Sequence, residues 1–202
     1  DHASEFDFVQ FRASFWRIRY TGTVAVFDDL EGRSVSGTVP RKNAGFHVLS
    51  VRLSKRWTAE FYEGMVFTDD TLSGVRQVLD LALFNPLLHL KQVEWEYDSL
   101  GSKFIGVGCS FVAGRGHSFR TQLLLTEFTA SKIFSEPGYW ANKWGYLIGY
   151  RYAPSSVPLI AGLEYSTARP HTYSHQQSGT SFIHYGDALG HPAGQNFVDW
   201  SA

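Results

Sequence analysis

The sequence predicts an all-β fold, an antiparallel transmembrane β-barrel of which about eight strands lie in these 202 residues. Three observations support this prediction. Eight segments of about ten residues alternate apolar or aromatic side chains with polar residues or glycine, the period-two pattern of a strand with one apolar face. The links between these segments alternate strictly between short and long. No stretch approaches the run of about 18 uncharged apolar residues that indicates a transmembrane helix.

The first segment, residues 6–15, alternates imperfectly, and the second is residues 18–27. Residues 46–53 and 57–67 follow, and in the second of these Glu63 interrupts the apolar face. The clearest hairpin covers residues 103–128, where a tight Gly114-Arg115-Gly116 turn joins two alternating segments. A strand of this length suits a membrane, because a tilted transmembrane strand needs about 9–11 residues and a typical soluble one has about five or six.

The last two segments are residues 142–152 and 159–169. The first of them has the cleanest alternation in the chain, with Trp144, Tyr146 and Ile148 on one face. A soluble β-sandwich is the alternative interpretation of any single hairpin of this kind. The repetition of the pattern favours the barrel.

The long links are residues 28–42, 69–102 and 129–141 and the tail 170–202, and outer-membrane barrels place such links outside the cell. Residues 92–98 resemble a strand when taken alone, but we assign them to a loop because a ninth strand would break the alternation of short and long links. We therefore interpret residues 1–202 as one barrel segment with extracellular loops. Since the chain begins and ends on the long-loop side, we expect a consecutive slice of a larger barrel.

Composition and motifs exclude several functional classes. The formal net charge of −1 provides no basic surface for nucleic acid. The single cysteine, Cys109, is interpreted as a small apolar side chain. Four of the eight histidines lie in the tail, but their spacing matches no standard zinc pattern, so no metal or other cofactor is expected. No GxSxG motif frames Ser174 or Ser181, and the paired Glu94 and Glu96 are ordinary for a surface loop, so no enzyme activity is expected.

Two dense motifs lie at the end of the last segment and in the tail, RPHTYSH at residues 169–175 and HYGDALGHPAGQN at residues 184–196. This part of the chain resembles the capsule assembly Wzi family of bacterial outer-membrane proteins, in the branch found in the Bacteroidota. Residues 11–12 (FR), 83–86 (LFNP) and 142–146 (NKWGY) give weaker support. The resemblance implies a non-enzymatic barrel in the bacterial outer membrane that binds or helps assemble capsular polysaccharide. Its partners would then be outer-membrane lipid, surface polysaccharide and other envelope proteins.

Aromatic and histidine side chains in the loops and tail suit sugar recognition, because rings stack on sugar faces and polar groups bond hydroxyls. The candidate polysaccharide-binding residues are Trp95, Tyr97, Tyr139, Trp140, His171, Tyr173, His175, His184, Tyr185 and His191. The alternative is that these aromatics pack the loops or form the girdle at the membrane edge. We expect the tail to fold over the lumen as a plug.

Charged residues on the polar face of the strands are predicted to face the lumen. They are Arg12, Arg19, Arg52, Glu60, Arg120, Lys143, Arg151 and Glu164. This mixed set leaves two alternative functions open, a porin-like channel and a structural barrel subunit of a larger envelope complex.

Overall fold

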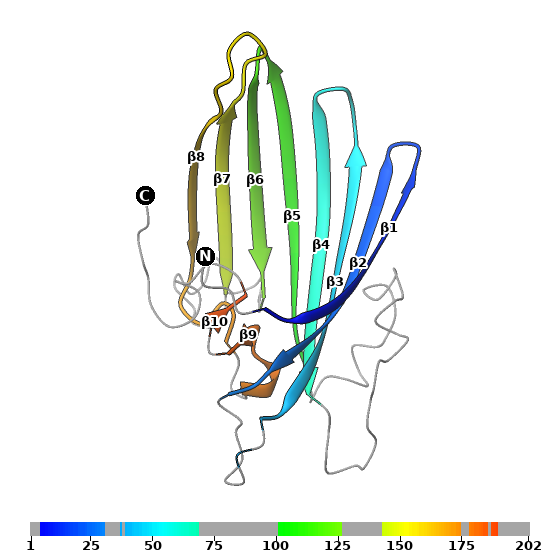
Figure 1. The fold of residues 1–202 in the computed structure, drawn as a ribbon, viewed down its shortest axis with the longest axis vertical. Helices are drawn as coiled ribbons and strands as arrows, with labels where there is room; N and C mark the ends of the chain where they lie inside the picture. The colour runs from blue at the N-terminus through cyan, green and yellow to red at the C-terminus, as the bar shows by residue number, and fades with distance from the viewer. Residues whose placement is uncertain are drawn as a thin grey trace, which may run out of the picture.

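The computed structural model describes residues 5–30, 37, 39–68, 101–126, 143–174, 178–185 and 187–189. One eight-stranded antiparallel sheet dominates it, with the strands in the order β1 to β8 (Figure 1). The strands are Asp7–Phe15 (β1), Ile18–Asp28 (β2), Arg41–Arg52 (β3), Trp57–Thr68 (β4), Gly101–Gly114 (β5), His117–Leu125 (β6), Trp144–Tyr152 (β7) and Ala161–Ala168 (β8). The prediction of an all-β, antiparallel, eight-stranded fold is confirmed.

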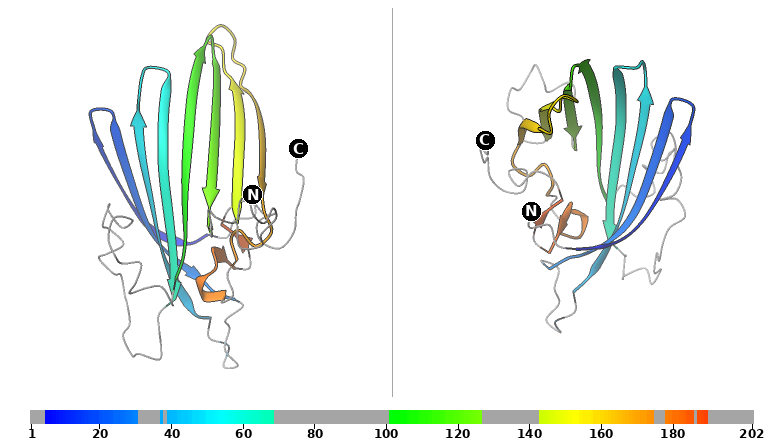
Figure 2. Two further views of the ribbon diagram at one scale, coloured as in Figure 1. Left: turned by 180° about the vertical axis from the view of Figure 1, so that it is seen from behind. Right: turned by 45° about the horizontal axis from the view of Figure 1, so that its top comes forward.

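Each strand pairs only with its neighbours in the sequence. Within the described ranges β1 and β8 each have a single partner strand, so the sheet is open. The sheet curves, and the segment after β8 lies against the end where β2 and β4 finish (Figure 2). No helix in this part of the chain is long and apolar enough to cross a membrane.

Short turns join the strands in pairs at the opposite end of the sheet (Figure 1). The Gly114-Arg115-Gly116 turn has φ values of 95°, 52° and 87°, the left-handed region in which glycine costs least. Trp16 begins the β1–β2 turn with φ 51°, and the Arg17 guanidinium lies 4.9 Å from the centre of its ring. The predicted positions of these short turns are therefore correct.

Several strand ends and one element differ from the prediction. β3 begins at Arg41 and β5 at Gly101, inside links that were assigned to loops. The added residues pair with a neighbouring strand, and Arg41, for example, pairs with Asp28 of β2. Small and polar residues in these extensions obscure the alternating pattern. The sequence predicts that the tail is a long link without strands. In the structure the tail contains a 3-10 turn, Ser178–Thr180 (η3), and a small two-stranded sheet of Ile183–His184 (β9) and Asp187–Ala188 (β10). Strands of two residues are too short for periodicity to reveal.

The register assigns side chains to two faces of the large sheet. One, the tail-packed face, carries the core: Ala25, Phe27, Ala44 and Val66 pack around Phe182 of the tail. Phe6, Phe46, Phe104, Tyr173 and Leu189 border this cluster. The tail is thus held by an apolar anchor, and the core lies at the end of the sheet away from the short turns.

The other face, the apolar face, is exposed over much of its area. All eight strands contribute large exposed apolar side chains to it: Val9, Phe15, Ile18, Leu49, Trp57, Phe61, Ile105, Val107, Phe119, Leu123, Ile148 and Leu163. The described residues place no second sheet against this face. A sandwich core of the ordinary soluble kind is therefore not formed by the part of the chain that the structure describes.

Glu63, which interrupts the apolar pattern, has a specific partner. It lies directly opposite His47 in the β3–β4 register, and His47 Nδ1 is 2.8 Å from Glu63 Oε1. The two side chains are only 5% and 7% exposed, so the pair is buried on the apolar face. The ring of Tyr20 lies 5.8 Å from the imidazole, centre to centre.

Candidate functional site

The tail is fixed to the sheet by buried polar side chains as well as by Phe182. Lys42 Nζ donates to the Ser181 carbonyl at 3.0 Å, and Lys143 Nζ donates to the Ser174 carbonyl at 3.3 Å. Both lysines are almost fully buried. A buried ammonium is costly unless its donors are used, so these contacts favour one position of the tail.

Thr172 closes the turn that follows β8. Its hydroxyl donates to the Arg169 carbonyl at 2.6 Å, and its own carbonyl accepts a bond from Thr126 Oγ1 at 2.9 Å. The side chain is fully buried. The first tail motif therefore forms a hydrogen-bonded turn against β6 and β7.

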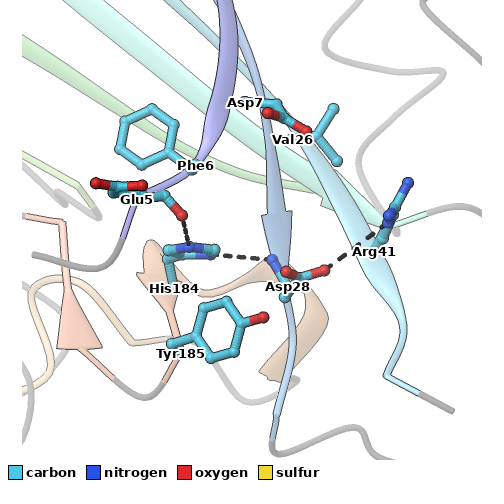
Figure 3. A pocket seen from close by; sticks show the side chains of 8 residues that line it. All are labelled: Glu5, Phe6, Asp7, Val26, Asp28, Arg41, His184 and Tyr185. Carbon is cyan, nitrogen blue, oxygen red and sulfur yellow. Dashed lines mark hydrogen bonds and ion pairs between the residues drawn. The ribbon is translucent and has the colours of Figure 1, made fainter.

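His184 joins the second motif to the opposite edge of the sheet. Its Nδ1 accepts the Asp28 backbone N–H at 3.0 Å, and its Nε2 lies 3.0 Å from the Glu5 carbonyl (Figure 3). Because a carbonyl only accepts, the proton must reside on Nε2 and Nδ1 must be the acceptor. The imidazole is 3% exposed and packs edge-on against Phe6. Both ring nitrogens are therefore used in hydrogen bonds that hold the tail in place.

A cavity of about 310 Å³ opens beside His184 (Figure 3). The lining residues are Glu5, Phe6, Asp7, Val26, Asp28, Arg41, His184 and Tyr185. The Asp28 carboxylate and the Arg41 guanidinium form a loose ion pair at 3.9 Å across this cavity's edge. Tyr185 has φ 51° and is 47% exposed, so its ring is presented to solvent.

This arrangement can bind a hydroxyl-rich ligand. A ring such as that of Tyr185 can stack on a sugar face, and the carboxylate and guanidinium can bond hydroxyls. His184 cannot serve as a ligand or base there while both its nitrogens are engaged. No group of three metal-ligating side chains occurs among the residues described.

The structure brings together only part of the predicted polysaccharide site. His184 and Tyr185 line the cavity. Tyr173 instead borders the core, and His171 is an exposed turn residue whose Nδ1 lies 3.1 Å from Ser174 Oγ. The remaining candidates lie outside the described residues: Trp95, Tyr97, Tyr139, Trp140, His175 and His191.

Sequence reasoning did not associate Glu5, Asp28 or Arg41 with the tail. These residues stand at strand ends, where a polar side chain is ordinary and carries no signal of its own. Asp28 is 156 residues from His184, and only the packing of the tail brings them together.

The charged residues predicted for the lumen all lie on the tail-packed face. Arg52 and Arg120 fall in one cross-strand row with Glu164, and Arg120 and Glu164 form an ion pair. Ser50 Oγ donates to Glu60 Oε1 at 3.3 Å. Lys143 differs from the others because it is buried beneath the tail.

Comparison of this chain with family models, with curated proteins and with solved structures finds no match. The resemblance to the Wzi family therefore stays a prediction that rests on the sequence motifs alone.

Proposed function

We propose that this chain is a segment of a bacterial outer-membrane β-barrel of the Wzi kind, and that it binds or helps assemble surface polysaccharide without enzyme activity. The apolar face carries the proposal. Exposed large apolar side chains on all eight strands form a surface of a kind that soluble monomers rarely present. A lipid bilayer is the environment in which such a face is stable.

Strand length agrees with this assignment. β1 to β7 contain nine to 14 residues. About 9–11 residues suffice for a tilted strand to cross the hydrocarbon layer. The short turns at one end and the tail at the other match the asymmetry of outer-membrane barrels.

The open edges set a requirement for the proposal. A strand in hydrocarbon cannot leave its backbone N–H and C=O groups without partners, because each such group costs several kcal/mol. β1 and β8 each have one free edge within the described part of the chain. The proposal therefore requires further strands that pair with both edges and close the barrel.

The cavity beside Tyr185 is the proposed polysaccharide contact. It lies at the end of the sheet opposite the short turns, the end that faces outward in such barrels. It combines an exposed aromatic ring with charged groups that can bond hydroxyls. Mobility shift of the detergent-solubilised protein with dextran and with polygalacturonate tests this contact. A shift with neither polymer would oppose the polysaccharide assignment.

The native Cys109 offers a direct test of the membrane assignment, because it is the only cysteine and lies on the apolar face of β5. We would attach an environment-sensitive fluorophore to it in lipid vesicles. Brominated lipid should quench this probe, and aqueous iodide should not. The matched control is Cys109→Ala/Ser110→Cys, which moves the probe to the tail-packed face and should reverse the result. Equal quenching of both probes by iodide, with none by brominated lipid, would rule out the membrane assignment.

A porin-like channel is the second candidate function. The arginines of the tail-packed face favour it, because charged rings line selective pores. The tail packed across one end of the same face opposes free passage. Single-channel conductance in planar bilayers separates the two functions, since a plugged barrel should conduct little.

A further inference from the structure

Five arginines gather on the tail-packed face near the short turns. They are Arg12, Arg19, Arg52, Arg120 and Arg151, and all five are exposed. Each lies within a few residues of the short-turn end of its strand. The lysines of this face, Lys42 and Lys143, lie at the other end and are buried under the tail.

The register places these arginines close to one another. Arg19 pairs with Ser14 and Ser50, so Arg12 and Arg52 are its diagonal neighbours. In the same way Arg120 pairs with Gly149, next to Arg151 on the same face. Diagonal neighbours lie about 7–8 Å apart, a separation at which like charges repel. Glu60 and Glu164 are the only carboxylates on this half of the face among the described residues, so positive charge predominates.

A hollow of about 520 Å³ lies over β6, β7 and β8 at this end. Its polar lining includes Ser110, Ser118, Arg120, Arg151 and Glu164. Gly149 and Gly162 leave room in it because they carry no side chain. A Cβ on Gly149 would lie 2.9 Å from Arg120 Cγ, so the arginine reaches Glu164 by passing directly over this glycine.

We propose that this hollow binds an acidic sugar unit, with the sugar carboxylate held by Arg120 and Arg151. Guanidinium groups bind carboxylates with two parallel hydrogen bonds, and the hydroxyls of Ser110 and Ser118 are suited to sugar hydroxyls. Arg151 has no ion-pair partner within the described residues, whereas Arg120 shares Glu164. The sugar class rests on the proposed function, but the site is separate from the cavity beside Tyr185 and lies at the opposite end of the sheet.

The test uses the full chain in detergent micelles and two probes of equal length, trigalacturonate and neutral maltotriose. Titration calorimetry should detect trigalacturonate, with weaker binding at high salt, and should detect little maltotriose. Arg120→Gln and Arg151→Gln should each weaken trigalacturonate binding by about tenfold, the effect expected for a hydrogen bond to a charged group. Glu164→Gln should strengthen binding, because it frees Arg120 from its competitor.

Arg56→Gln is the matched control, since it removes the same charge from the short turn between β3 and β4. It should leave binding unchanged. Equal binding of maltotriose, unchanged binding by both arginine variants, or an equal loss in Arg56→Gln would each overturn the proposal. Inorganic phosphate that competes as well as trigalacturonate would overturn the sugar class and leave a simple anion site.

These outcomes are distinguishable from failure of the proposed function. Quenching at Cys109 and the polysaccharide mobility shift are measured on the same preparations. If both give their expected results while the arginine variants bind trigalacturonate like the wild type, only the acidic-sugar hollow is refuted.

Discussion

The buried pair of His47 and Glu63 gives the most quantitative prediction. The two groups are 2.8 Å apart on the apolar face, and their side chains are 5% and 7% exposed. Replacing His47 with leucine leaves the Glu63 carboxyl buried without its imidazole partner. Loss of one member of a buried pair costs about 3–5 kcal/mol of folding free energy. Glu63→Leu should have a cost of the same order, for the same reason.

The double variant His47→Leu/Glu63→Leu should behave differently. Apolar residues of similar volume remove both polar groups at once, so its stability should be close to that of the wild type or higher. The coupling energy from the cycle, which is the cost of the double variant minus the two single costs, should therefore be about −6 to −10 kcal/mol. Urea unfolding in detergent micelles, followed by tryptophan fluorescence, measures all four proteins.

Ser50→Ala serves as a control on the same strand, because it removes a part-buried hydrogen bond on the opposite face. It should cost about 1 kcal/mol. If His47→Leu costs less than about 1 kcal/mol, as an exposed pair would, the pair is solvated and the reasoning about a dry apolar face is wrong.

Phe182→Ala should remove the side chain that anchors the tail in the core, at a cost of about 3–5 kcal/mol of folding free energy. Hydrogen exchange should then accelerate in residues 168–189. Unchanged protection there would contradict the anchoring role. Ile148→Arg should cost about 2–4 kcal/mol of folding free energy in the membrane and so impair assembly, whereas Gln122→Arg on the tail-packed face should assemble normally. Heat-modifiable migration in gels measures assembly. Normal assembly of both variants would contradict the assignment of faces. Tyr185→Asn, which keeps a residue tolerant of positive φ, should abolish the mobility shift with dextran, and Tyr185→Phe should retain it. Loss of the dextran shift in both variants would mean that the phenolic hydroxyl matters and that stacking alone does not explain binding.

The sequence alone determined where the eight strands of the large sheet lie, apart from their exact ends, and which face of each is apolar. Residues such as Trp144, Tyr146 and Ile148 alternate with glycine and charged residues, and this local pattern is enough to specify a strand. The Gly114-Arg115-Gly116 turn was equally predictable, because few other residues accept positive φ at adjacent positions. The same period-two pattern also placed the eight charged residues predicted for the lumen on one face.

Only the tertiary structure decided how the tail docks and what surrounds it. His184 reaches Glu5 across 179 residues and Asp28 across 156, and no local pattern encodes bonds between segments so far apart. The partner of Glu63 depends on the β3–β4 register, which places His47 opposite it. Hydrogen bonds of this kind are set by packing in three dimensions, whereas alternation is set by the geometry of a single strand.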